Sequence, residues 1–171
     1  MKSFLLGFVV ALALIAIGGF AYLALGFAPV ATSSSPLPFE RFLAHLAMHA
    51  RISRDPLAQP TIQPSEPVYL AGAEIYKTNC AVCHGLPGAE PTGIAKGEFP
   101  PPPDLFHGKG VSDDPPGITY WKVANGIRLT GMPGFNGSLT STQMWQVSLM
   151  LANSDKLPED VVGALKAGHG Q

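Results

Sequence analysis

The chain's two cysteines stand in a pattern that has a specific chemistry. Cys80 and Cys83 are separated by two residues and are followed directly by His84, so the segment reads C-x-x-C-H. Two thiols at this spacing can each add to one vinyl group of a haem, and the imidazole that follows can bind the iron. The motif therefore predicts one covalently attached haem c, held through Cys80 and Cys83, with His84 as an axial iron ligand.

Other interpretations of the cysteine pair are open. A thioredoxin-like dithiol carries C-x-x-C in a strand-helix setting, whereas the residues before Cys80 have a helical pattern. A structural zinc site needs four ligands, usually supplied by a second cysteine or histidine pair, and these are the only two cysteines in the chain. A chance occurrence of the motif is the third alternative.

A second axial ligand is predicted at Met132, which stands in the segment Gly-Met-Pro-Gly. A thioether is a soft iron ligand, and His/Met ligation raises the reduction potential of a haem. Met144 and Met150 fall on a predicted helix and are interpreted as core residues, whereas a methionine between glycine and proline has little core to fill. His107 is the alternative sixth ligand, but it lies between a proline-rich loop and a Gly-Lys-Gly segment.

Three segments in order resemble a class I monohaem cytochrome c. They are AGAEIYKTNCAVCHG at 71–85, NGIRLTGMPGF at 125–135 and a last helix that contains Trp145. The resemblance covers about residues 68–154 and is strongest to small bacterial domains related to the third subunit of cbb3-type oxidases. The resemblance implies an all-α domain in which the first and last helices cross beside the haem. It also implies that Cys80 and Cys83 are covalently bonded to the haem and that His84 and Met132 are the axial ligands of its iron. One departure is Met150, where the family often has tyrosine.

The elements that must position these residues follow from the pattern. Helices are predicted at 68–79, 118–127 and 140–152, the last begun by Ser138 or Thr140 as N-cap. These helices form a predicted haem domain at 68–157, followed by a C-terminal tail at 158–171 that is expected to be mobile. The segment 86–117 is rich in glycine and proline and is predicted to be an irregular loop beside the haem. A carbonyl from Pro100–Pro103 is expected to accept the outer N–H of His84.

Composition points to a membrane segment at the N-terminus. The chain is 46% hydrophobic and only 13% charged, and residues 3–39 carry no charge. Residues 4–27 form a nearly unbroken apolar run that would span about 36 Å as a helix, more than the roughly 30 Å of a hydrocarbon core. A transmembrane anchor at 4–27 is therefore predicted, preceded by a cytoplasmic N-terminus at 1–3. A cleaved secretory signal is the alternative, although its apolar region is normally only about 7 to 15 residues.

The orientation of the anchor comes from the resemblance. Counting cations gives the opposite answer, because Lys2 alone precedes the span whereas Arg41, Arg51 and Arg54 follow it. Family members attach their haem outside the cytoplasm, which implies a single-pass protein of the bacterial inner membrane with its haem domain in the periplasm. The expected topology is N-terminus in and haem out.

Between anchor and haem domain, residues 28–67 are predicted to be a juxtamembrane linker that contains an amphipathic helix at 39–54. Its apolar residues recur at steps of three and four: Phe39, Phe42, Leu43, Leu46 and Ala50. This face is expected to lie on the membrane, on a partner subunit or against the haem domain. His45 and His49 are four residues apart and form a possible metal pair, but no H-E-x-x-H signature accompanies them.

Charge restricts the function further. Residues 67–160 carry six Lys or Arg and nine Asp or Glu, so nucleic-acid binding is disfavoured. Two function classes remain. One is an electron carrier or electron-transfer subunit of a respiratory or related redox chain, with the membrane and redox proteins as partners and no catalytic residues. The other is a haem enzyme or gas-sensing module with an open sixth iron position, which the Gly-Met-Pro segment argues against.

Overall fold

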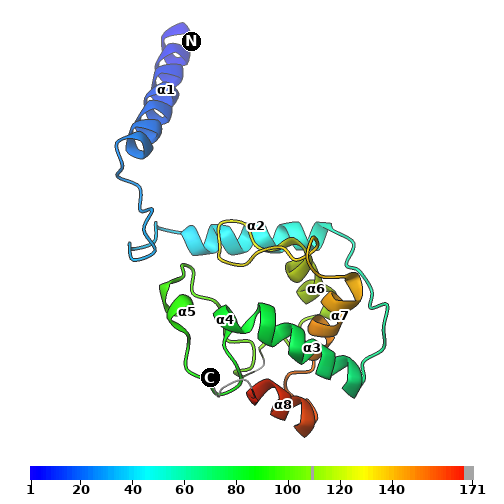
Figure 1. Cartoon of the computed structure of the whole chain (residues 1–171). Coiled ribbons are helices and arrows are strands. Elements are labelled where there is room, and N and C mark those ends of the chain that lie inside the picture. The colour runs from blue at the N-terminus through cyan, green and yellow to red at the C-terminus, as the bar shows by residue number, and fades with distance from the viewer. Residues whose placement is uncertain (109, 168–171) are drawn as a thin grey trace. The chain divides into compact units, whose positions relative to one another are not determined.

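The computed structural model describes residues 1–108 and 110–167, and among them it contains only helices as regular elements (Figure 1). The helices are α1 (Lys2–Ala24), α2 (Glu40–Arg54), α3 (Glu66–Asn79), α4 (Ala81–His84), α5 (Gly93–Gly97), α6 (Pro116–Asn125), α7 (Ser141–Leu151) and α8 (Glu159–Lys166). The predicted all-α fold is confirmed. The helices predicted before, between and after the motifs correspond to α3, α6 and α7, each within two residues at either end.

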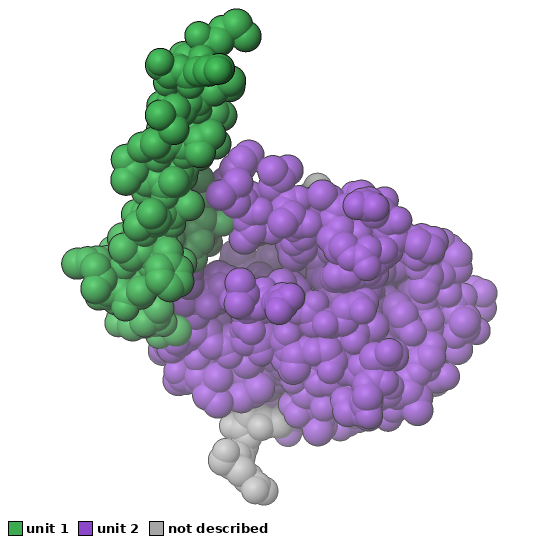
Figure 2. Space-filling view, turned by 90° about the horizontal axis from the view of Figure 1, so that it is seen from above, with its two compact units in different colours: residues 1–41 green, residues 42–171 purple. Residues whose placement is uncertain are grey.

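The chain divides into a unit of residues 1–41 and a unit of residues 42–171, coloured separately in Figure 2. The first unit contains α1, which has a mean hydropathy of 2.6 and no buried residue. Its 23 residues are long and apolar enough to cross a membrane. The predicted apolar segment at 4–27 is therefore helical up to Ala24.

The core of the second unit is centred on the contact between α3 and α7. Tyr76 from α3 and Val147 and Met150 from α7 are 0% exposed. A Cβ added to Gly72 would lie 2.5 Å from the Gln146 carbonyl oxygen and 2.9 Å from Met150 Cβ. Only glycine lets the two helices approach this closely. The predicted crossing of the first and last haem-domain helices thus has Gly72 at its contact point, beside the methionine that departs from the family pattern.

The capping of α7 and the packing of α6 support the same core. Thr140 is the N-cap: its hydroxyl accepts from the Gln143 backbone N–H, and the Gln143 side chain accepts from the Thr140 N–H. This reciprocal arrangement satisfies two backbone donors that the first turn leaves unpaired. Tyr120 of α6 stacks on Trp145 of α7 with ring centroids 4.1 Å apart. Trp145 is 1% exposed, so this stacked pair belongs to the core.

The segment after Pro158 differs from the expected mobile tail. Its first part forms α8, in which Val161 and Leu165 are 0% exposed and belong to the same cluster as the α3 and α7 residues. Glu159 and Asp160 stand in the first turn, where carboxylates favour a helix because they interact with its positive end. The prediction of a mobile tail is wrong for these residues, because burial of two aliphatic side chains holds the helix. Residues 168–171 lie outside the described part of the chain.

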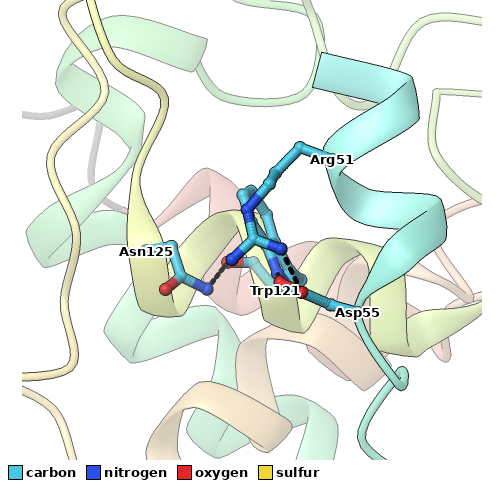
Figure 3. A network of polar contacts seen from close by, with 4 residues as sticks. All are labelled: Arg51, Asp55, Trp121 and Asn125. Atoms are coloured by element: carbon cyan, nitrogen blue, oxygen red, sulfur yellow. Dashed lines mark hydrogen bonds and ion pairs between the residues drawn. The ribbon is translucent and has the colours of Figure 1, made fainter. Parts of the chain in front are cut away.

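The predicted amphipathic helix is present as α2, and its C-terminal end is joined to α6. The Trp121 indole Nε1 donates to Asp55 Oδ2 at 2.8 Å, Arg51 pairs with Asp55 Oδ1, and Asn125 Nδ2 donates to the Trp121 carbonyl at 2.9 Å (Figure 3). The hydrogen bond from Trp121 lowers the pKa of Asp55 below its ordinary value. The second unit therefore includes α2 from Phe42 onward, whereas the sequence grouped the whole helix with a linker ending at residue 67.

Candidate functional site

The C-x-x-C-H residues lie where α3 ends and the single turn of α4 begins. Cys80 is the C-cap of α3 and the N-cap of α4. The N–H groups of Cys83 and His84 both donate to the Cys80 carbonyl, at 3.1 and 2.9 Å. The turn therefore brings the two thiols and the imidazole into one short, hydrogen-bonded segment. Both cysteines are free of disulfides and are partly buried.

The imidazole of His84 is oriented by the proline-rich loop. Its Nδ1 lies 2.8 Å from the carbonyl oxygen of Pro103. Because a carbonyl only accepts, Nδ1 carries a proton, and in the neutral imidazole Nε2 then has the lone pair that can bind a metal. The sequence predicted such a contact from one of the carbonyls of Pro100–Pro103, and the structure identifies Pro103.

Tyr76 supports the other end of this turn, a role that sequence reasoning missed. Its hydroxyl donates to the Gly85 carbonyl at 2.8 Å, and its ring contacts Phe106 edge-on with centroids 5.1 Å apart. Burial raises the pKa of Tyr76 well above its usual range, so the phenol remains a donor. The residue after the motif is thus tied to the centre of the core. The position of Tyr76 within the helix predicted at 68–79 was visible in the sequence, but the partner of its hydroxyl was not.

A cavity of about 220 Å³ opens beside Cys83 and His84. Its other lining residues are mainly apolar and come from the segment after the motif: Leu86, Ala89, Pro91, Ala95, Pro101 and Pro102. Ala95 belongs to α5, a short helix within the segment that was predicted to be irregular throughout. The Thr92 hydroxyl caps α5 and donates to the Val82 carbonyl at 2.5 Å, which ties α5 to the motif. This mainly apolar cavity therefore lies directly against the side chains of Cys83 and His84.

Met132 lies in a tight loop that returns along α6. Its N–H donates to the Thr130 hydroxyl at 3.1 Å, and its carbonyl accepts from Ile127 N–H at 3.1 Å. A Cβ on Gly126 would lie 2.5 Å from the Gly134 nitrogen, so the two ends of the loop touch backbone to backbone. The Met132 side chain is partly buried against the same core cluster as Cys80. The backbone of the loop around Met132 is therefore held by hydrogen bonds and by close packing.

Glu98 is a further residue that the sequence did not single out. The Cys83 thiol donates to Glu98 Oε1 at 2.8 Å, and a Cβ added to Gly131 would lie 2.6 Å from Glu98 Oε2. The carboxylate thus lies between the C-x-x-C-H turn and the Met132 loop. The hydrogen bond to Glu98, followed by burial, raises the pKa of Cys83 to about 11. Burial raises the pKa of Cys80 to about 12, so both thiols are protonated at neutral pH.

The donor set fits a haem better than a directly bound metal ion. Within the described residues, no three His, Cys, Asp or Glu side chains are grouped so that they could hold a metal. A haem iron needs only axial ligands from the protein, because the porphyrin occupies the other positions. Two reduced thiols, an imidazole with Nε2 available and an apolar cavity match that requirement. The Cys83–Glu98 hydrogen bond is compatible only with a free thiol, because a thioether sulfur has no proton to donate.

The other candidate ligands lie on other segments of the chain. His107 is exposed in the segment that follows the proline loop. His45 and His49 stack on each other on α2 with ring centroids 6.3 Å apart. Of the residues singled out by sequence, the structure joins Cys80, Cys83 and His84 in one turn and places Met132 in the loop that follows α6.

Comparison with known proteins bears on the same region. Residues 67–149 match the family described as cytochrome C oxidase, cbb3-type, subunit III. No curated protein matches the chain. Among solved structures, a chain of a reducing HAO-like protein complex from Kuenenia stuttgartiensis is similar, with 26% sequence identity and a TM-score of 0.48. The match covers 62% of this chain and 54% of the other, so it spans about half the length of that protein.

Proposed function

Because residues 67–149 form a class I cytochrome c domain of the cbb3-type subunit III family, we propose that the chain is a membrane-anchored monohaem cytochrome that transfers single electrons. The family carries covalently bound haem c and acts in electron transfer. The proposal adds the particular residues, the anchor and the setting. Cys80 and Cys83 form the two thioether bonds, His84 and Met132 are the axial ligands, and α1 crosses the bacterial inner membrane.

The contact between His84 Nδ1 and the Pro103 carbonyl, 2.8 Å long, is the observation that carries this proposal. It fixes the plane of the imidazole and increases the electron density on Nε2, as hydrogen bonds to the outer nitrogen of a ligating histidine do. When bound, the haem supplies an iron that changes by one electron between its two oxidation states. The protein's task is to keep both ligands in place through that change.

The loop around Met132 supports that task. Thr130 and Ile127 hold the backbone of Met132 on both sides, and the next turn is tied to α6, where Phe135 N–H donates to the Val123 carbonyl at 2.9 Å. A sulfur ligand on a loop that moves little between oxidation states lowers the reorganisation that electron transfer requires. This arrangement favours an electron carrier over a haem with an open sixth position.

The setting of the domain belongs to the proposal as well. The anchor keeps the haem domain at the periplasmic face, where c-type haem is attached in related proteins. Its partners there are redox proteins of a respiratory or related chain, such as another cytochrome, an oxidase or a dehydrogenase complex. No catalytic acid or base is needed, because electrons enter and leave through the haem edge.

Absorption spectroscopy of the full chain, produced with haem-maturation machinery, tests the ligands. Oxidised wild type is expected to show the weak far-red band of sulfur-to-iron ligation, and Met132→Ala to lose it. Leu129→Ala is the matched control, because Leu129 lies in the same loop and is 92% exposed, so its band should persist. A wild-type spectrum without the band would overturn Met132 as ligand and favour the haem enzyme or gas sensor.

A second measurement tests the attachment. Haem staining after denaturing electrophoresis should detect covalent haem in wild type, and the pyridine haemochrome spectrum should be that of two thioether bonds. Cys80→Ala should shift this spectrum toward that of a single thioether. Haem that is lost from wild type on denaturation would contradict the assignment of both cysteines.

A further inference from the structure

Helix α2 has two apolar faces of different character. Ile52 is 5% exposed and lies on the face that is joined to the haem domain through Asp55. Phe42, Leu43 and Leu46, which we call the outer stripe, are 64%, 57% and 55% exposed. With 3.6 residues per turn, the centre of the outer stripe lies about 130° around the helix from Ile52. The haem domain therefore covers one apolar face of α2 and leaves the other in contact with solvent.

The charges on α2 match an anionic surface. The helix carries three arginines and one glutamate. On the helical wheel Arg54 borders the outer stripe next to Leu43, and His49 borders it next to Phe42. An apolar stripe bordered by an arginine on one side and a histidine on the other is similar to the pattern of helices that lie in a membrane interface. Each cation near anionic headgroups adds to such binding.

The chain keeps the outer stripe close to a bilayer. Helix α1 ends at Ala24 and α2 begins at Glu40. A flexible chain of the length of residues 25–39 has a mean end-to-end distance of about 20 Å, and full extension would allow about 50 Å. Binding of the outer stripe to that bilayer is therefore an intramolecular event at high effective concentration. A separate protein partner would have to compete with this tethered surface.

We infer that the outer stripe lies in the headgroup region of the bilayer that α1 crosses, with anionic lipids as its ligand. The inference rests on the anchor in the proposed function. Ile52 and the Asp55–Trp121 hydrogen bond then fix the haem domain to a helix that is itself fixed on the membrane. The haem domain is thereby held in one orientation toward the membrane instead of moving freely on a tether.

Single-cysteine labelling tests this arrangement. In the haem-loaded chain Cys80 and Cys83 are occupied, and the sequence has only those two cysteines, so an introduced cysteine is the one reactive thiol. Leu46→Cys places a polarity-sensitive fluorophore on the outer stripe. Ala44→Cys is the matched control, because Ala44 is also exposed but lies on another side of α2. Leu14→Cys reports on the anchor in the same way.

The full haem-loaded chain is placed in nanodiscs of phosphatidylcholine and phosphatidylglycerol, and quenching by aqueous iodide and by nitroxide-labelled lipid is measured. We expect the label at position 46 to be blue-shifted, several-fold less quenched by iodide than the label at position 44, and strongly quenched by the lipid nitroxide. Phe42→Cys provides a second position on the outer stripe if the label at position 46 disturbs folding.

Two results would overturn the inference. Equal iodide quenching at positions 46 and 44, with the label at position 14 in lipid, would show that the anchor spans the bilayer while the outer stripe stays in water. Protection of position 46 in detergent without lipid, growing with protein concentration, would show that a second copy covers the stripe. If the label at position 14 is itself exposed to iodide, the anchor of the proposed function fails, and the inference fails with it.

Discussion

Replacing Gly72 by alanine tests the close approach of α3 and α7, the helix that leads into the C-x-x-C-H turn being α3. The added Cβ would lie 2.5 Å from the Gln146 carbonyl oxygen and 2.9 Å from Met150 Cβ. Non-bonded carbon atoms prefer about 3.5 to 4 Å. Because the carbonyl oxygen belongs to the α7 backbone, it cannot rotate away, and the two helices must separate.

The size of the effect follows from a matched pair of glycines. Gly163 is also in a helix, but a Cβ there would meet nothing within 4 Å. Glycine to alanine in a helix gains about 1 kcal/mol at both positions through backbone entropy. That gain cancels in the comparison, so the difference between Gly72→Ala and Gly163→Ala measures the overpacking alone. Overpacking typically costs about 1 to 3 kcal/mol of folding free energy. Because the Cβ of Gly72→Ala would clash with backbone, we expect a cost of about 3 kcal/mol.

Thermal unfolding of the full haem-loaded chain in one mild detergent gives the comparison. Trp145 is buried in α7, and haem quenches nearby tryptophan, so its emission rises when the domain opens. At about 4 °C per kcal/mol for a domain of this size, the melting temperatures of Gly72→Ala and Gly163→Ala should differ by about 12 °C. Gly163→Ala should melt slightly above wild type and Gly72→Ala below it. If Gly72→Ala melts at or above the temperature of Gly163→Ala, the helices do not touch as described, and the reasoning is refuted.

Three further predictions concern single hydrogen bonds. The pKa of Asp55 is lower in the folded chain than in the unfolded chain, so its carboxylate stabilises the fold above the unfolded pKa of about 4. This stabilisation is lost as the pH falls through the folded pKa. In Asp55→Asn the melting temperature should therefore decrease less with acidification than in wild type, and an equal decrease in both would contradict the contact. Tyr76→Phe leaves the Gly85 carbonyl without its donor and should cost about 1 kcal/mol in urea unfolding, whereas an unchanged urea midpoint would count against this role. Thr140→Ala removes the hydroxyl that accepts from the Gln143 N–H in the α7 capping box and should cost about 1 kcal/mol. Thr140→Ser should keep most of that stability, and equal melting temperatures for the two variants would argue against the cap.

The order of elements was largely visible in the sequence because it depends on local patterns. Apolar spacing and capping residues predicted α2, α3, α6 and α7, and both Met144 and Met150 are buried as expected. The prediction of a mobile tail was wrong at α8 for a physical reason. Its eight residues include only a few aliphatic side chains, and those are stabilising only when α3 is present to cover them.

In the candidate site, too, local patterns were visible in the sequence and contacts between distant segments were not. C-x-x-C-H could be recognised without a structure, because covalent attachment requires the thiols and the imidazole within one turn. Glu98 gave no signal, because its proximity to Cys83 and Gly131 arises only when three separate segments meet. The choice of Pro103 among neighbouring prolines likewise depends on the path of the loop after α5.

The sequence by itself determined the C-x-x-C-H motif, the apolar segment at 4–27 and the periodicity of the main helices, since each depends on residues close together in the chain. The tertiary structure decided which face of α2 is covered, which carbonyl orients His84, and why α3 needs glycine where it meets α7. These features depend on distances between residues far apart in sequence. Such distances are settled only when the whole core packs, because each contact is possible only if the others form at the same time.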